Sequence, residues 1–235
     1  MPLQADSKDS VEMPGACVLY GRGEIVSSLS ALLEKNCISC ATIQPDKVHA
    51  ANGGLDDGAL LQKLGKKGAS ALSDFIYVAP LAMENVFRLR PDRLMELEAE
   101  SLGECMRIAQ ALLQLNLEKT PRLWIVTRGA QGPELSNVPH STLWGFGRSV
   151  AAEHAEMRVV RMDMDPARDA TAEELLRCMR MAESEDELAL RGRETYVPRL
   201  RHLTREPKLT AGEESNLRLE LKEAGTLEGI ENVVV

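Results

Sequence analysis

The feature that most constrains the fold is a regular alternation of short apolar runs with longer segments of helical periodicity. Each apolar run is as long as one strand, and the runs lie at 16–20, 40–43, 74–78, 123–127 and 158–162. The segments between them repeat apolar residues every three or four positions, at 24–35, 92–115, 142–154 and from 172 onward. Strands that alternate with helices join into a parallel sheet by crossover connections. We therefore expect an α/β fold, a Rossmann-like doubly wound parallel sheet.

Local signals predict where several helices begin. Pro91 suits the first turn of the second helix, where its missing N–H costs nothing. Thr171 and Glu174 have the spacing of a capping box, which predicts a helix directly after Thr171. Ser141 is expected to cap the helix at 142–154.

The chain after the last helix is strand-like and then changes character. Two short apolar segments flank Gly192 and predict a hairpin. Residues 216–223 alternate leucines with polar or charged side chains, as in a half-buried strand. We predict four parts: a flexible leader at 1–14, a Rossmann-like domain at 15–203, a linker at 204–215 and a separate β segment at 216–235.

Composition excludes several classes of function. The formal net charge is −8 and the isoelectric point is about 5.2. Nucleic-acid binding draws its affinity from neutralised phosphates, and no basic cluster here is interleaved with aromatic residues. No apolar run approaches the roughly 18 residues of a membrane span, and the start lacks the pattern of a signal peptide. We expect a cytoplasmic protein that binds neither nucleic acid nor membranes.

The cysteines predict neither disulfides nor a metal site. Their number is five, and their spacing is scattered. Cys37 and Cys40 form a Cys-x-x-Cys pair in a turn that enters a strand, whereas a reactive pair belongs at a helix start. A zinc site would need a second pair. We interpret these residues as small, semi-buried thiols.

A Rossmann-like sheet raises the hypothesis of a dinucleotide site between the first strand and helix. Gly21 and Gly23 match the first two glycines of the fingerprint G-x-G-x-x-G, but Val26 stands where the third glycine is required. A side chain there is expected to hinder close packing of helix on strand and to crowd a pyrophosphate. Gln44 follows the second strand, and Asp46 comes slightly late for an acid that holds a ribose. We therefore expect no cofactor-binding residues.

The sequence around the tyrosines also argues against a reductase active site. Short-chain reductases use a tyrosine whose pKa is lowered by a lysine four residues on, together with a serine. None of the three tyrosines has that lysine; the pairs are Tyr20 with Glu24, Tyr77 with Leu81, and Tyr196 with Leu200. We therefore predict no catalytic residues.

Other catalytic arrangements are missing from the sequence as well. The histidines are scattered without metal-ligand spacing, and they are His49, His140, His154 and His202. His140 beside Ser141 is interpreted as a helix start. Neither a G-x-S-x-G elbow nor a P-loop occurs.

Four segments in order resemble a known family. They are Leu123–Gln131 (LWIVTRGAQ), Leu143–Arg148 (LWGFGR) with Glu153-His154, Arg158–Pro166 ending in Asp-x-Asp-Pro, and Glu185–Leu200 (EDELALRGRETYVPRL). Together they resemble the ketoreductase region of modular polyketide and fatty acid synthases. That resemblance implies two pseudo-Rossmann halves, of which the first is structural and truncated and the second binds NADPH and carries the serine, tyrosine and lysine. All four segments resemble the first half.

The resemblance also implies partners. Residues 217–229 resemble the opening strand of an enoylreductase domain, which in these synthases often lies between the two ketoreductase halves. The expected partners are therefore the catalytic ketoreductase half, which would hold NADPH, and the enoylreductase. Trp144, Phe146 and Val150 are candidates for that contact or for the core. Arg148 is expected to pair with an acid such as Glu153 or to reach a neighbouring domain.

Three functions stay open at this point. The first is a non-catalytic scaffolding domain of a synthase. The second is half of a split ketoreductase that works only with a separate catalytic half. The third is an independent oxidoreductase with a divergent site, against which the missing Tyr-x-x-x-Lys argues; an unrelated small-molecule-binding Rossmann protein is a residual alternative.

Overall fold

The structure is a computed structural model of the 235-residue chain. It describes residues 16–48, 58–60, 62, 72–80, 89–115, 117–132, 137–182, 185–200, 217–221 and 230–234. The chain divides into two compact units, residues 1–199 and 200–235. The predicted leader at 1–14 and linker at 204–215 lie outside the described residues.

Seven strands form one sheet in the first unit, in the order β2-β1-β3-β4-β5-β6-β7. The strands are β1 Ala16–Tyr20, β2 Ser39–Ile43, β3 Leu72–Val78, β4 Arg122–Arg128, β5 Val159–Met164, β6 Glu187–Arg191 and β7 Glu194–Tyr196. All neighbours pair in parallel except β6 and β7, which form the predicted hairpin. The expected Rossmann-like α/β fold is confirmed.

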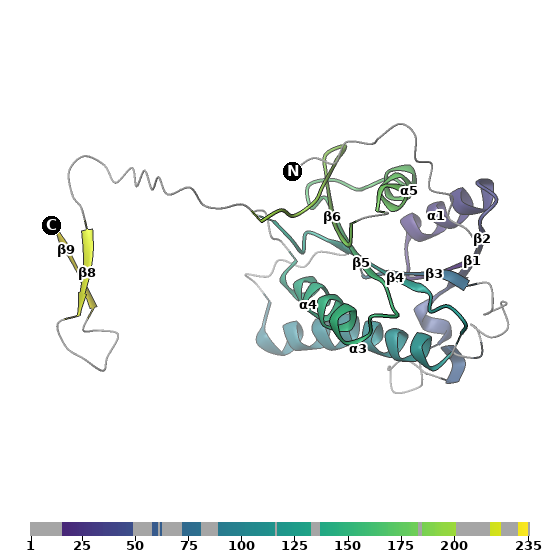
Figure 1. Cartoon of the computed structure of the whole chain (residues 1–235), viewed down its shortest axis with the longest axis horizontal. Coiled ribbons are helices and arrows are strands. Elements are labelled where there is room, and N and C mark those ends of the chain that lie inside the picture. The colour runs from purple at the N-terminus through teal and green to yellow at the C-terminus, as the bar shows by residue number, and fades with distance from the viewer. Residues whose placement is uncertain are drawn as a thin grey trace. The chain divides into compact units, whose positions relative to one another are not determined.

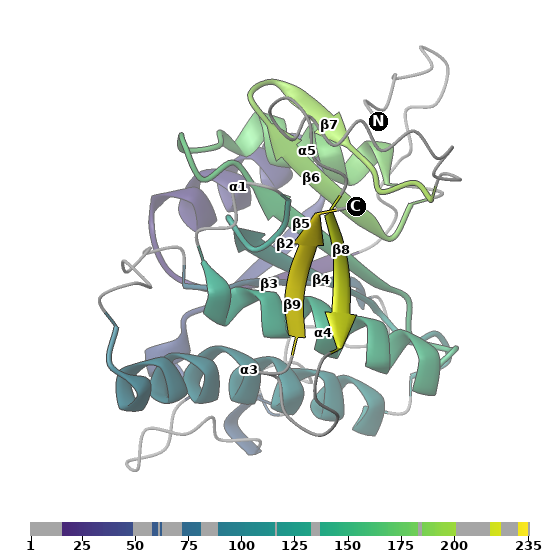
Figure 2. The ribbon, with the colours of Figure 1, turned by 90° about the vertical axis from the view of Figure 1, so that its left-hand side faces the viewer.

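Helices cover both faces of this sheet (Figure 1). On one face lie α1 (Glu24–Lys35) and α5 (Ala172–Met181), and on the other lie α3 (Pro91–Gln114) and α4 (Val138–Glu153). Each helix layer buries its own apolar cluster against the sheet. Figure 2 shows α3 and α4 lying beside each other along their shared layer. Because both sheet faces are covered, β3, β4 and β5 are apolar along most of their length rather than alternating.

The signals for the helix starts were right in two cases and wrong in one. Pro91 begins α3, and Thr171 and Glu174 form the complete capping box of α5. The start of α4 is wrong, because the helix begins at Val138 and not after Ser141. Pro139 fits the first turn of that helix, and the Ser141 hydroxyl donates to the carbonyl of Val138 at 2.6 Å instead of capping.

The second unit contains one described hairpin. Strands β8 (Leu217–Leu221) and β9 (Ile230–Val234) pair antiparallel, which agrees with the period-two pattern of leucines in the sequence. Within the described ranges, no helix is both long and apolar enough to span a bilayer.

Candidate functional site

A cavity of about 760 Å³ opens at the carboxyl ends of the strands. It lies where the strand order reverses between β1 and β3, the place at which open α/β sheets bind ligands. Its described lining comes from the ends of β1, β3, β4 and β5 and from the starts of α1 and α5: Arg22, Gly23, Glu24, Ile25, Ser28, Pro80, Arg128, Met164, Asp169, Ala170, Thr171, Ala172 and Glu173. We refer to it as the switch-point cavity.

The glycine turn at this cavity departs from the dinucleotide fingerprint. A Cβ atom on Gly21 would lie 3.0 Å from Cβ of Val78 and 3.2 Å from Cγ2 of Val26, so only glycine fits there. Val26 is buried and packs with the core cluster of α1 and α5. Helix α1 therefore packs on the sheet despite the valine, and an isopropyl group stands at the position of the third glycine.

The acid that follows β2 is engaged by the chain itself. Asp46 lies in the short 3₁₀ helix Pro45–Lys47, and its carboxylate forms an ion pair with Arg22 of the glycine turn. Both side chains are well exposed, so the pair contributes little to stability. It does place a cation against the carboxylate that was considered for a ribose.

Arg128 at the end of β4 was missed by the sequence analysis. Its guanidinium lines the switch-point cavity and donates to the carboxylate of Asp169 at 2.7 Å. It also donates to the backbone carbonyls of Asp165 and Pro166 at 3.2 Å. The available signal was its position after a buried strand, since that edge of the sheet is where ligands bind. Here the arginine ties β4 to the loop after β5.

None of the three tyrosines lines the described part of this cavity. Tyr20 and Tyr77 are buried in the sheet, and burial raises the pKa of both hydroxyls. The Tyr77 hydroxyl donates to the carbonyl of Ser101 at 3.0 Å. Tyr196 lies on β7, where a hydrogen bond to Glu194 raises the pKa of its hydroxyl. A raised pKa is the opposite of what a tyrosine acid needs near neutral pH.

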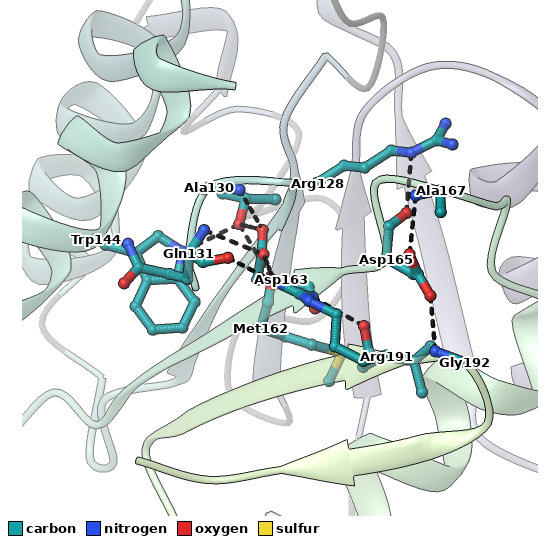
Figure 3. A network of polar contacts seen from close by, with 12 residues as sticks. Arg128, Ala130, Gln131, Trp144, Met162, Asp163, Asp165, Ala167, Arg191 and Gly192 are labelled. Carbon is teal, nitrogen blue, oxygen red and sulfur yellow. Dashed lines mark hydrogen bonds and ion pairs between the residues drawn. The ribbon is translucent and has the colours of Figure 1, made fainter. Parts of the chain in front are cut away.

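The family-like segments converge on Asp163, a buried carboxylate of β5 (Figure 3). It accepts hydrogen bonds from the Thr127 hydroxyl at 2.8 Å, from the N–H groups of Ala130 and Gln131 at 2.8 and 3.2 Å, and from Arg191 at 2.6 Å. The indole N–H of Trp144 donates to the same Thr127 hydroxyl at 3.0 Å. Four segments that are far apart in sequence are thus tied together around one side chain. We refer to this network as the Asp163 framework; its members are Thr127, Ala130, Gln131, Trp144, Asp163 and Arg191.

Asp165, two residues on, fixes the neighbouring hairpin. Its carboxylate accepts from the N–H of Gly192 at 2.6 Å and from the N–H of Ala167 at 2.8 Å. Burial would raise the pKa of Asp165, but these two donors and the charges of Arg191 and Arg168 together outweigh it, and the pKa lies below its ordinary value. The Asp-x-Asp-Pro pattern therefore serves to hold β4, β5 and the β6–β7 turn together.

The helix motif packs as core and not as an exposed surface. Trp144 and Val150 are buried, and Phe146 is half-buried against the apolar cluster that contains Val150. Arg148 pairs with an acid, as expected, but the acid is Glu187 of β6 and not Glu153, through two hydrogen bonds at 2.6 and 2.9 Å. The sheet brings these residues together across 39 positions, which spacing along a helix does not reveal.

Arg161 lies close to the ion pair between Arg148 and Glu187. It is almost fully buried on β5 and approaches Glu187 at 3.2 Å. Two of its guanidinium nitrogens, Nε and Nη1, are buried without a hydrogen-bond partner among the described residues. Burial is the main reason that the pKa of Arg161 is lowered, and the cations of Arg148 and Arg161 lower the pKa of Glu187.

Gly147 is required where α4 crosses Arg161. A Cβ atom there would lie 2.9 Å from Cδ of Arg161 and 3.1 Å from Cδ1 of Ile125. We expect Gly147→Ala to lower the free energy of unfolding by about 1–2 kcal/mol, because overpacking outweighs the better helix propensity of alanine. Urea denaturation followed by circular dichroism measures it.

Gly145 is the matched control for that substitution. It lies two residues earlier in α4 and is exposed, and a Cβ atom added to it would meet no described neighbour within 4 Å. Gly145→Ala is expected to raise the free energy of unfolding by about 0.5–1 kcal/mol. Equal effects of the two substitutions would contradict the role given to Gly147.

The five cysteines are free thiols in environments that differ in burial. Cys37 is exposed in the turn, and Cys40 is half-buried on β2. Burial raises the pKa of Cys105 and Cys178, so these two thiols are not poised to react. In the part of the chain that the structure describes, no three His, Cys, Asp or Glu side chains gather as a metal site.

Comparison with known proteins shows where the chain belongs. Residues 38–200 match the family described as polyketide synthase extender module SpnB, Rossmann fold domain. The chain belongs to this family. The expected relationship to polyketide synthases is therefore confirmed.

Curated synthases extend this similarity. The chain is 32% identical over 141 residues to the phthioceranic/hydroxyphthioceranic acid synthase of Mycobacterium tuberculosis (strain ATCC 25618 / H37Rv). It is 28% identical over 164 residues to a phenolphthiocerol/phthiocerol polyketide synthase of the same strain. The aligned parts cover 57% and 66% of this chain but only 6% and 10% of those synthases. The chain spans a small fraction of the relatives that it matches.

Solved structures share the fold at low identity. An N-terminal ketoreductase from the macrolactin assembly line superposes with a TM-score of 0.55 at 15% identity, over 80% of this chain and 41% of that one. Acetoin dehydrogenase YohF from Salmonella typhimurium superposes with a TM-score of 0.53 at 15% identity, over 77% and 96%. The fold is therefore that of short-chain dehydrogenase/reductase domains.

Proposed function

We propose that this chain is the structural, non-catalytic half of a ketoreductase in a polyketide synthase module. It would stabilise and position a catalytic half that holds NADPH and reduces a β-keto group. The observation that carries the proposal is Val26, which occupies the third-glycine position and packs beside Gly21 at the switch-point cavity.

Two further observations support a scaffolding role. The described lining of the switch-point cavity contains neither tyrosine nor lysine, so its known walls lack the acid of a reductase. The family-like segments direct their polar groups inward, toward Asp163 and Asp165, where they hold the sheet together. Side chains used in this way stabilise the domain and are not available to a substrate.

We place the protein in the cytoplasm, where its partners would be the catalytic ketoreductase half and an enoylreductase domain of the same synthase. The β8–β9 hairpin would open that enoylreductase, as the resemblance of residues 217–229 implies.

Binding of NADPH tests the proposal directly. Isothermal titration calorimetry of the purified chain with NADPH up to millimolar concentrations is expected to show no saturable heat, because the fingerprint turn is incomplete. An intact ketoreductase titrated under the same conditions is the positive control.

A saturable signal would contradict the proposal if it came from the switch-point cavity. Arg128→Ala distinguishes that case, since Arg128 lines the cavity. Loss of the signal in this variant would place the cofactor there and would make the chain an NADPH-binding domain.

The split ketoreductase is the second candidate, since the four family-like segments resemble only the first of two ketoreductase halves. Mixing the chain with a separately produced catalytic half separates the two functions. A split enzyme is expected to reduce a β-keto thioester only in the mixture. A scaffold is expected to raise the melting temperature of the catalytic half without being required for turnover.

A further inference from the structure

A second, smaller cavity of about 150 Å³ lies between the starts of α3 and α4, close to the end of β3. Its described lining consists of Pro80, Leu89, Arg93, Leu97, Glu100, Ser101, Asn137, Pro139 and His140. It shares only Pro80 with the described lining of the switch-point cavity and includes none of the Asp163 framework. We refer to it as the His140 cavity.

His140 supplies one hydrogen-bond donor to this space. The residue is only 5% exposed, and the side-chain amide nitrogen of Asn137 lies 2.9 Å from its Nδ1. In that arrangement the amide donates and Nδ1 accepts, so the hydrogen of the neutral ring is on Nε2. Among the described residues, none is hydrogen-bonded to Nε2. Since Nδ1 is engaged by Asn137, Nε2–H is the ring donor that His140 has left for a ligand in the cavity that it lines.

The remaining walls carry balanced charge and apolar surface. Arg93 is 3.1 Å from the carboxylate of Glu96 and 4.0 Å from that of Glu100, so its charge is compensated within α3. Burial lowers the pKa of His140 to about 4, although the charge of Asp163 acts against it, and the imidazole is neutral at pH 7. A charged ligand would therefore find no uncompensated partner among these groups.

We propose that the His140 cavity binds a small neutral carbonyl compound, whose oxygen accepts a hydrogen bond from His140 Nε2–H and whose short apolar chain packs against Leu89 and Leu97. A cavity of about this volume holds a molecule the size of benzene, with about six non-hydrogen atoms. Complete ligand pockets are larger, so the cavity would hold a small molecule or the carbonyl end of a longer one. This proposal does not depend on the scaffolding function.

Propionamide is the probe that matches this description, and its charged analogue propionate is the control. We would titrate the isotope-labelled full chain and follow the Hε1 resonance of His140 and the backbone amides of Leu97 and Ser101 by NMR. Propionamide is expected to shift these signals saturably with a millimolar dissociation constant. Propionate is expected to bind at least about tenfold more weakly, because its charge is not compensated in the cavity.

Two variants test the cavity from opposite walls. His140→Leu removes the donor, and Leu97→Phe fills the space while leaving His140 in place. Each is expected to weaken propionamide binding about tenfold or more, with the amide spectrum of the rest of the domain unchanged. If His140→Leu does not fold, Leu97→Phe still decides the question.

Three results would overturn the proposal. The first is that the wild-type chain shows no saturable shift with propionamide. The second is that both variants bind propionamide as tightly as the wild type does. The third is that propionate binds as tightly as propionamide, which would mean that the site recognises carboxylates.

Discussion

Replacing Asp163 by alanine is expected to lower the free energy of unfolding by about 3–5 kcal/mol. The variant removes the carboxylate that accepts from the Thr127 hydroxyl and from two backbone N–H groups, and it leaves the charge of Arg191 with hydrogen bonds to backbone carbonyls alone. Buried donors that lose their partner cost far more than the net contribution of the hydrogen bonds that they made. Urea denaturation followed by circular dichroism measures the loss.

Asp169→Ala is the matched control for this prediction. Asp169 is also an aspartate paired with an arginine, at 2.7 Å from Arg128, but its side chain is 91% exposed. Its removal is expected to change the free energy of unfolding by less than about 1 kcal/mol. If the two alanine variants lose similar stability, Asp163 is not the centre of the framework.

The stability of the domain is expected to fall by about 2 kcal/mol between pH 7 and pH 5 because of His140. Its pKa is about 4 in the folded chain, against an ordinary value of 6.5, so the unfolded chain binds the proton first. Stability is therefore fully present above pH 6.5 and is lost as the pH falls toward 4. Among the described groups, Asn137 is hydrogen-bonded to the ring, Arg93 and Glu100 line the same cavity, and the charge of Asp163 acts on the imidazole.

His140→Gln removes this titration while keeping a side-chain N–H donor. The variant is expected to show a flatter stability profile between pH 7 and pH 5 than the wild type does, measured by urea denaturation at each pH. The carboxylates with lowered pKa values, such as Glu174 and Glu187, become protonated in the folded chain at lower pH than the range from 7 to 5. Their titration is therefore separate from that of His140. Parallel profiles for the two proteins would show that His140 is not buried in its neutral form.

Polar side chains serve two purposes in this domain. Those of the Asp163 framework bond to one another, whereas others line the two cavities. Thr127, Trp144 and Arg191 are satisfied within the domain and hold its segments in register. His140 presents its remaining donor to a cavity, and Arg128 lies at the switch-point cavity. Substitutions in the framework should therefore change stability, whereas those at the cavities should change binding.

The alternation of apolar runs and helical segments was sufficient to predict the fold class. Strands such as β4 and helices such as α5 are defined by local spacing and by the capping box at Thr171, so neighbouring residues carry the information. The missing lysine after each tyrosine and the valine at position 26 were also readable, because these motifs are short and continuous.

The framework and the small cavity could not be predicted, because their parts are distant in the chain. Asp163 meets Arg191 across 28 residues and Thr127 across 36, and Arg148 meets Glu187 across 39, all through the order of strands in the sheet. His140 looked like a helix start in the sequence, and only the packing of α3 beside α4 surrounds it with a cavity. Local spacing specifies which segments are strands and helices, whereas burial and pairing of charged groups depend on which of those segments become neighbours.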